Sequence, residues 1–271
     1  MLSAFKFSLN RLRNKQLFGN DSSAPQGEQI YLAPEFSPDV LKAVRLISTC
    51  LHLTANEKSR LLWQAESNAA SLVEYEALLP LFAKMQKPKK ILEVGPGLGR
   101  SAVIFGKKKV WNEDATVHLY DTDGSRTKYK QKHYDRPPKW PDVSSFCGNL
   151  ELLDTILKYN GVSNCTIFDA AQNDLKTLPG PYDLIYGFYS IGFHWSIEHY
   201  LDDLEPLMDR QTVILCTLNK HFTAFPKLAS YSTRVLQAAG TKKGSRPLSF
   251  LALSKSALPE VGLSVEEAFS A

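Results

Sequence analysis

The sequence lacks the features that define several large classes of protein. No apolar run in its 271 residues approaches the roughly 18–20 that a transmembrane helix requires. Cysteine is scarce: the four cysteines are scattered and form no Cys-x-x-Cys pair, which argues against a disulfide framework and a zinc ribbon. We therefore expect a protein of the reducing cytoplasm. The formal net charge of +4 is too small to indicate a nucleic-acid-binding protein by itself.

Motifs of several enzyme classes are absent as well. The chain has no Gly-x-Ser-x-Gly elbow of a hydrolase, and no phosphate-binding lysine follows its glycine-rich segment. No His, Cys and carboxylate residues have metal-ligand spacing, so we expect no metal site, although ligands drawn from separate loops would leave no such spacing. His118 alternates with Val117 and Leu119, which favours a hydrogen-bonded core histidine over a catalytic one.

The chain does contain a glycine-rich loop after a short apolar strand. Glu93 precedes three glycines spaced two apart, Gly95, Gly97 and Gly99, and the residues that follow can open a helix. Glycine lets the backbone approach a ligand closely, and the helix end presents free N–H groups there. The dinucleotide-binding fingerprint would place its third glycine at Arg100, so the spacing indicates another kind of nucleotide site.

The pattern Glu93-x-Gly95-x-Gly97-x-Gly99 resembles motif I of the class I S-adenosylmethionine-dependent methyltransferases. The resemblance implies that these glycines, with Pro96, lie against the methionine end of S-adenosylmethionine. It also implies that Glu93 helps to hold the cofactor's amino group, often through water.

Alternating elements follow the loop. Strands are expected over 91–94, 116–120, 165–168, 184–189, 212–218 and 248–253, and helices over 99–105, 150–159, 197–208 and 227–238. This alternation predicts an α/β fold: a Rossmann-like, doubly wound, mostly parallel sheet, which the family resemblance extends to seven strands. The antiparallel hairpin usual in that family has only a weak candidate first strand, residues 240–246.

The part of the chain before the loop reads as a helical extension. Helices are expected from residue 37, over 56–65 and over 71–85, so we divide the chain into residues 1–87, a basic segment and helical lead-in, and residues 88–271, the cofactor-binding domain.

The first 18 residues are basic and carry no acid. We interpret them as a terminal helix on the domain or a partly disordered segment. Docking on a membrane surface or a partner, or service as an organellar presequence, are the alternatives.

Acidic residues end two further predicted strands. Ligands of open α/β sheets bind beyond the carboxyl ends of the strands, so these residues are candidates for cofactor contacts. Asp121, with Asp123 as a fallback, is suited to accept hydrogen bonds from both ribose hydroxyls. The resemblance implies that Asp169 accepts from the adenine amino group and that the N–H of Ala170 contacts the ring.

The fourth strand and the loop after it carry the reacting groups in this superfamily. The Asn/Asp-Pro-Pro-aromatic signature of methyltransferases that act on exocyclic amines is absent, which favours an oxygen, carbon or other nitrogen acceptor. His194 is the candidate general base because its ordinary pKa lies near neutrality, and His199 is the second choice. The surrounding aromatic residues are assigned to the cofactor site (Tyr189) and to the substrate pocket (Phe193, Trp195).

The glycine loop and the segment Gly192-Phe193-His194-Trp195 also look like those of bacterial sugar O-methyltransferases, a looser resemblance. The expected function is therefore methylation of a hydroxyl on a small molecule or glycan precursor. A basic stretch at residues 126–139, interleaved with aromatic residues, keeps a nucleic-acid (RNA) methyltransferase open as an alternative. A binding module that holds S-adenosylmethionine without turnover is a second alternative.

Overall fold

The computed structural model describes residues 68–97, 99–122, 150–162, 164–188, 190–192, 196–218, 222–238 and 248–269. Several predictions lie outside these residues: the basic segment 1–18, the helices expected before residue 68, the fallback Asp123, the basic stretch 126–139 and the weak strand 240–246.

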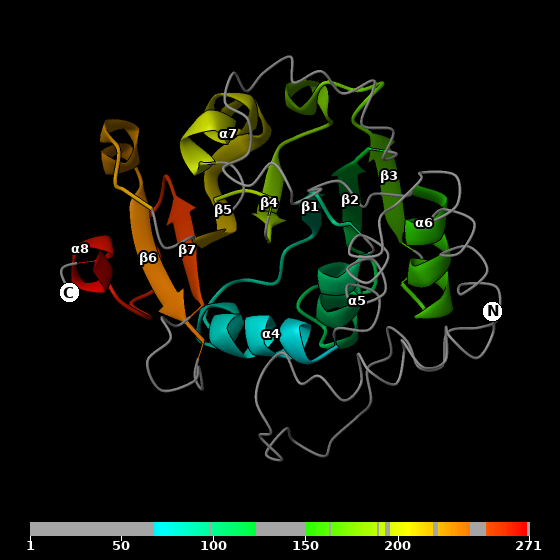
Figure 1. The fold of residues 1–271 in the computed structure, drawn as a ribbon, viewed down its shortest axis with the longest axis horizontal. Coiled ribbons are helices and arrows are strands. Elements are labelled where there is room, and N and C mark those ends of the chain that lie inside the picture. The colour runs from blue at the N-terminus through cyan, green and yellow to red at the C-terminus, as the bar shows by residue number, and fades with distance from the viewer. Residues whose placement is uncertain are drawn as a thin grey trace, which may run out of the picture.

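The described residues form one sheet with helices on both of its faces (Figure 1). The elements in chain order are α4 (Asn68–Phe82), β1 (Lys90–Val94), α5 (Arg100–Lys107), β2 (Thr116–Asp121), α6 (Leu150–Tyr159), β3 (Cys165–Asp169), η1 (Leu175–Thr177), β4 (Tyr182–Gly187), α7 (Ile197–Leu204), η2 (Glu205–Leu207), β5 (Met208–Leu218), η3 (Pro226–Ser230), β6 (Ser232–Gln237), β7 (Ser249–Ser254) and α8 (Val265–Phe269).

The sheet has seven strands in the order β3-β2-β1-β4-β5-β7-β6. Strands β1 to β5 pair in parallel, and β7 pairs antiparallel with both β5 and β6. The strand order reverses between β1 and β4, which is the point where open α/β sheets bind their ligands. The expected fold class, a Rossmann-like, mostly parallel, seven-stranded sheet, is confirmed.

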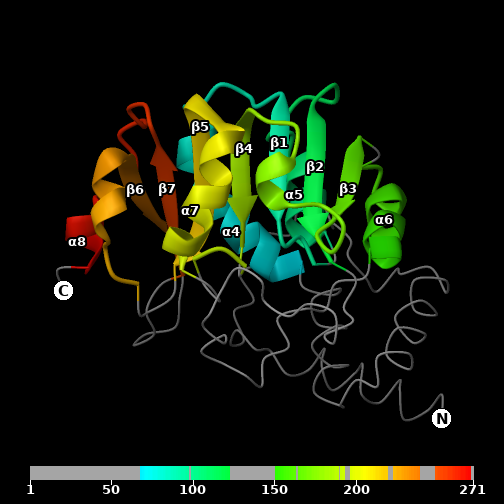
Figure 2. The ribbon, with the colours of Figure 1, turned by 90° about the horizontal axis from the view of Figure 1, so that it is seen from above.

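Successive strand residues enter two different cores, one on each face of the sheet. Ile91 packs with side chains of α4, α5 and α6, whereas its neighbour Leu92 packs with side chains of α7 and the 3-10 segments. Figure 2 shows α7 and α4 on opposite sides of the strands. A strand buried on both faces has no polar alternation, and this is why apolar residues follow one another at Ile91 and Leu92 of β1 and at Leu184 and Ile185 of β4.

Helix α4 belongs to the first of these cores. Its residues Leu78 and Leu81 are fully buried, and they share the cluster with Phe105 of α5 and Leu184 of β4. The helical lead-in therefore contributes part of the core of the sheet domain.

One predicted helix is wrong. Residues 227–238, expected to be helical, form η3 and then the strand β6. Leu228, Tyr231 and Val235 are spaced three and four apart, as on a helix face, and all three are buried in the same core. Pairing with β7 from Ser232 to Gln237 overrides that local pattern. The expected antiparallel hairpin thus exists, but its first strand precedes the weak candidate at 240–246.

The predicted helix over 197–208 is shorter than expected. Helix α7 ends at Leu204, a 3-10 turn containing Pro206 follows, and Met208 already begins β5. Proline has no N–H for an i→i−4 hydrogen bond, which favours an end of the α-helix at this point, although α4 accommodates Pro80 in its interior. Within the described ranges, no helix is long and apolar enough to cross a membrane.

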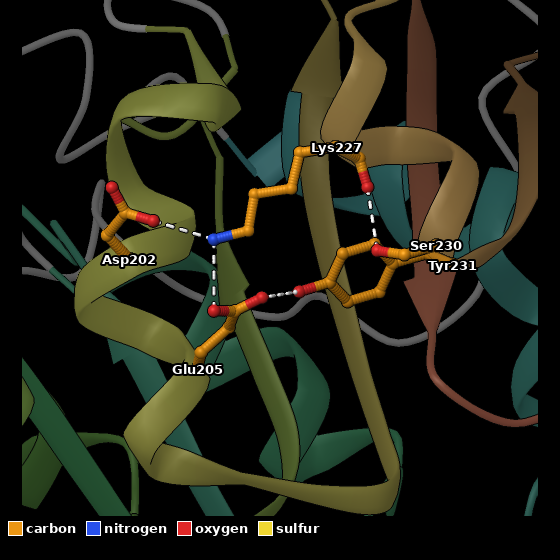
Figure 3. A network of polar contacts seen from close by, with 5 residues as sticks. All are labelled: Asp202, Glu205, Lys227, Ser230 and Tyr231. Atoms are coloured by element: carbon orange, nitrogen blue, oxygen red, sulfur yellow. Dashed lines mark hydrogen bonds and ion pairs between the residues drawn. The ribbon is translucent and has the colours of Figure 1, made fainter.

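A polar network joins α7 and η2 to η3 (Figure 3). The Lys227 ammonium lies 2.6 Å from Asp202 Oδ1 and 3.0 Å from Glu205 Oε2. The Tyr231 hydroxyl donates a hydrogen bond of 2.6 Å to the other oxygen of Glu205. Because the helix lies between β4 and β5 in the chain and η3 lies between β5 and β6, this network ties together two connections that flank β5 in sequence.

Candidate functional site

The glycine loop between β1 and α5 has a backbone that other residues adopt only with strain. Gly95, Gly97 and Gly99 have φ values of 71°, 58° and 74°, all in the left-handed region. The N–H of Gly95 donates to the carbonyl of Tyr120 over 2.8 Å, and the N–H of Gly97 donates to Asp121 Oδ2 over 2.8 Å. The loop is therefore held in place by the end of β2.

The same loop touches the segment that follows β4. A Cβ added to Gly95 would lie 2.6 Å from Cβ of Ser190, which no real pair of atoms tolerates. A Cβ on Gly187, the last residue of β4, would lie 2.6 Å from Ser190 Oγ and from the Val94 carbonyl oxygen. Ser190 donates its hydroxyl to that carbonyl. The glycine loop is thus in direct contact with Ser190, at the start of the loop that is expected to carry the reacting groups.

Glu93 is buried beneath the glycine loop. It is 2% exposed and accepts a hydrogen bond of 2.9 Å from the hydroxyl of Tyr186, which lies beside it in register on β4. Burial raises the pKa of Glu93 to about 8, against the opposing effect of the Tyr186 hydrogen bond. At neutral pH this carboxyl group is therefore mostly protonated.

A second buried acid lies close to the first. Glu74 of α4 is fully buried and forms an ion pair with Arg100, the first residue of α5. The charge of Glu74 raises the pKa of Glu93, and the charge of Arg100 lowers it. The polar group under the loop therefore has four members from four elements: Glu74, Glu93, Arg100 and Tyr186.

Asp121 ends β2 at the same edge of the sheet. Its Oδ2 accepts the Gly97 N–H, and its Oδ1 accepts the N–H of Thr122 over 2.8 Å. Both carboxylate oxygens of Asp121 therefore hold backbone N–H groups at this edge of the sheet. Asp121 thus shapes the glycine loop in addition to the binding role expected of it.

Asp169 ends β3 in register with Asp121. Its Oδ1 accepts the N–H of Ala171 over 2.9 Å, and its Oδ2 accepts from the side chain of Gln172 over 3.0 Å. The N–H of Ala170 donates to the Asp121 carbonyl over 2.7 Å. The N–H of Ala170, which the family resemblance assigns to the adenine ring, is thus hydrogen-bonded to the end of β2 in this structure.

The candidate base and the aromatic pocket residues, His194, Tyr189, Phe193 and Trp195, lie outside the described residues. The residues on either side are placed: Ile191 and Gly192 are buried, and Ser196 caps α7 by accepting from the Glu198 N–H. His199, the second candidate base, lies in the first turn of α7 and is exposed.

His118 is a core residue, as its alternation predicts. It is 7% exposed, and its Nδ1 lies 2.8 Å from the Tyr182 hydroxyl. Burial lowers the pKa of His118. Over the part of the chain that the structure describes, no group of three or more His, Cys, Asp or Glu side chains could hold a metal ion.

Sequence reasoning missed three residues of this site: Glu74, Tyr186 and Ser190. A signal exists for the first, because Glu74 falls on the helix face marked by Ala77, Leu78 and Leu81, where an apolar residue is expected. Tyr186 and Ser190 carry no such signal, because only the pairing of β4 with β1 brings them to Glu93 and Val94.

No model of a known protein family matches the sequence, and no curated protein matches it. Solved structures do show similarity. The O-methyltransferase TomG from Streptomyces achromogenes, involved in tomaymycin synthesis, is 14% identical; the match covers 92% of this chain and 96% of that one, with a TM-score of 0.44. A SAM-dependent methyltransferase from Aquifex aeolicus is 12% identical over 73% of this chain and 98% of that one, with a TM-score of 0.48. The ribosomal protein L11 methylase from Lactobacillus delbrueckii is 17% identical; the match covers 68% of this chain and 78% of that one, with a TM-score of 0.40. At these identities and TM-scores the likeness says nothing about the substrate of this chain.

Proposed function

We propose that this protein is an S-adenosylmethionine-dependent methyltransferase that acts on a hydroxyl group of a small molecule or glycan precursor. One observation carries the cofactor part of this proposal: Glu93, Asp121 and Asp169 end or nearly end three adjacent parallel strands, β1, β2 and β3, beside a left-handed glycine loop. The three acids lie in the order in which the amino group, ribose and adenine of the cofactor follow one another.

The residues of the site fit this cofactor. Gly95, Pro96, Gly97 and Gly99 are assigned to the methionine end, where glycine lets the backbone approach a ligand closely. The positive φ of the three glycines forms the turn of the loop, and Cβ atoms on Gly95 and Gly99 would meet Ser190 and Leu153. Glu93 is the acid for the amino group, Asp121 the acid for the ribose hydroxyls, and Asp169 with Ala170 the adenine site. Tyr189 is assigned to the same site.

The cofactor supplies the methyl group and its sulfur leaving group. The chain has to orient the acceptor oxygen in line with that bond and to remove its proton. Orientation is worth on the order of several kcal/mol. His194 is the proposed base, with His199 as the second candidate, and Phe193 and Trp195 are the proposed walls of the acceptor pocket.

Incubation of the pure protein with methyl-labelled cofactor and a fractionated cell extract tests the acceptor. We expect a labelled small molecule or glycan precursor in which the label resists the conditions that cleave methyl esters and sits on an ether oxygen. Label on a base amine of RNA would show that the alternative, a nucleic-acid methyltransferase, is correct. Cofactor binding without any labelled product would favour the non-catalytic binding module.

Two histidine variants test the assignment of the base. With the labelled acceptor in hand, we expect His194→Ala to lower kcat by about 10²–10⁴ with little change in cofactor affinity, because a positioned base contributes that much. His199→Ala, which removes the exposed imidazole of the second candidate, is measured beside it, and we expect it to retain turnover. If His199→Ala abolishes turnover while His194→Ala retains it, the two roles are reversed.

A further inference from the structure

The polar group beneath the glycine loop holds two carboxyls and one guanidinium. Glu74 and Glu93 are 0% and 2% exposed, and the side chain of Arg100 is 11% exposed. Arg100 pairs with Glu74, whereas the hydrogen bond that the structure places on Glu93 comes from the neutral hydroxyl of Tyr186. The guanidinium group of Arg100 thus pairs with Glu74, and Glu93 accepts its hydrogen bond from an uncharged hydroxyl.

The charged and titratable groups around Glu93 come from every element packed against it. Glu74 on α4 and Asp121 on β2 disfavour its negative charge, while Arg100 on α5 and the Tyr186 hydroxyl on β4 favour it; burial exceeds all of these. On β3, Glu93 contributes to the raised pKa of Cys165. The resulting pKa of Glu93 is about 8, so its protonated form dominates at pH 7.

We propose that Glu93 releases its proton when the ammonium group of the cofactor arrives, so that cofactor binding near pH 7 is coupled to proton release. This inference rests on the proposed function. The O–H bond of the carboxylic acid breaks, the proton passes to the solvent, and the carboxylate that remains pairs with the ammonium group, directly or through a water molecule. No oxidant or second reactant is needed.

The physical reason is the balance of charge in a buried site. A carboxylate without a nearby cation is costly to bury, and the proton removes that cost while the site holds no ligand cation. An ammonium group within about 4–6 Å reverses the preference, because an opposite charge at this distance favours the ionised acid. Glu74 and Arg100 act as positioning residues: their ion pair lies beside Glu93, and their charges act on its pKa in opposite directions.

Isothermal titration calorimetry of the full chain tests the coupling. Binding of S-adenosylhomocysteine, which keeps the ammonium group, is measured at pH 7 in phosphate and in Tris, whose ionisation enthalpies differ strongly. The slope of the observed enthalpy against buffer ionisation enthalpy counts the protons exchanged. We expect the wild-type protein to release close to one proton per site more than Glu93→Gln.

Two further measurements make the test specific. 5′-Methylthioadenosine, which lacks the amino acid part, should bind without this proton release in either protein. Tyr186→Phe should move the release to higher pH, because the Tyr186 hydrogen bond lowers the pKa of Glu93. A structural role alone would change affinity in these variants without changing the proton count.

The outcomes separate the two proposals. Binding of S-adenosylhomocysteine with equal proton exchange in wild-type and Glu93→Gln protein would overturn the coupling and leave the proposed function intact. No binding of either ligand to folded wild-type protein would overturn both.

Discussion

At the residue scale, the acids of this site do more than a sequence motif assigns to them. Asp121 accepts hydrogen bonds from the N–H groups of Gly97 and Thr122, so the carboxylate expected to bind the ribose hydroxyls also shapes the glycine loop. Sequence reasoning placed Glu93, Asp121 and Asp169 because acids at strand ends are visible in the sequence. The hydrogen bond from the Tyr186 hydroxyl to Glu93 could not be predicted in this way, because it joins residues 93 positions apart.

Gly95 provides a residue-scale prediction with a matched control. Gly95→Ala adds left-handed strain, at φ 71°, and a clash with Ser190; Gly161→Ala adds the strain alone, at φ 73°, with nothing within 4 Å of the new Cβ. We expect Gly161→Ala to lose about 1 kcal/mol of stability and to bind S-adenosylhomocysteine normally. Gly95→Ala should be less stable than Gly161→Ala, as measured by urea unfolding. Its affinity for S-adenosylhomocysteine, measured by calorimetry, should fall at least about tenfold, since the displaced loop no longer fits the ligand. Equal behaviour of the two variants would show that the contact with Ser190 is unimportant.

The pKa of Glu93 also predicts how stability depends on pH. An unfolded glutamate ionises near 4.5, whereas the folded group has a pKa of about 8. Between these values the folded state binds the extra proton, so this residue makes stability fall as the pH rises, and the effect is complete above about pH 8. Relative to wild type, Glu93→Gln should therefore gain on the order of a few kcal/mol between pH 5 and pH 9, measured by urea unfolding. A difference that is constant with pH would contradict the raised pKa.

At the scale of single elements, tertiary pairing decided what local pattern left open. Leu228, Tyr231 and Val235 have a helix-like spacing, yet residues 232–237 form β6 because β7 offers them six paired positions. Helix α7 likewise ends at Leu204 because the Glu205-Pro206-Leu207 turn follows it and leads the chain into β5. Strand ends differ from prediction by one to four residues, since a local apolar run does not say where its partner strand begins.

The polar network of η3 leads to a prediction at this scale. The Tyr231 hydrogen bond to Glu205 is partly buried, whereas the Asp202 side chain is 84% exposed. We expect Tyr231→Phe to cost about 1 kcal/mol at pH 7, because it removes a hydrogen bond to a charged acceptor, and Asp202→Asn to cost under about 0.5 kcal/mol.

Acid should weaken this effect. The Tyr231 hydrogen bond, and then Lys227, lower the pKa of Glu205, so their stabilising contribution is present above the ordinary pKa of a glutamate and is lost as the pH falls through the lowered value. Urea unfolding of both variants at pH 7 and at pH 3 measures this. A larger loss in Asp202→Asn than in Tyr231→Phe would mean that the exposed ion pair is the stabilising contact.

At the scale of the whole molecule, helix α4 links the lead-in to the sheet. Leu78 and Leu81 are fully buried in the core of the sheet domain, and Glu74 pairs with Arg100 at the start of α5. The division of the chain at residues 87 and 88 marks a change of sequence character. We propose that it does not separate two units that fold independently.

A truncated chain tests this proposal. A chain that begins at residue 88 should fail to unfold cooperatively, because it leaves the α4 face of the sheet exposed and deprives Arg100 of its buried partner. The reference is Leu81→Ala in the full chain, which should cost about 2–5 kcal/mol and still unfold in one transition by circular dichroism. A cooperative transition in the truncated chain would show that residues 88–271 fold alone.

The sequence by itself determined the α/β class, the strand-loop-helix that carries the glycines and the acids at the three strand ends. These follow from local causes: apolar runs long enough for buried strands, and glycines where the backbone turns left-handed. Only the tertiary structure decided that β6 is a strand, that α4 brings a second acid beneath the loop and that Tyr186 is the hydrogen-bond donor to Glu93. These depend on contacts between residues distant in the chain, and the burial that raises the pKa of Glu93 exists only once those segments have packed together.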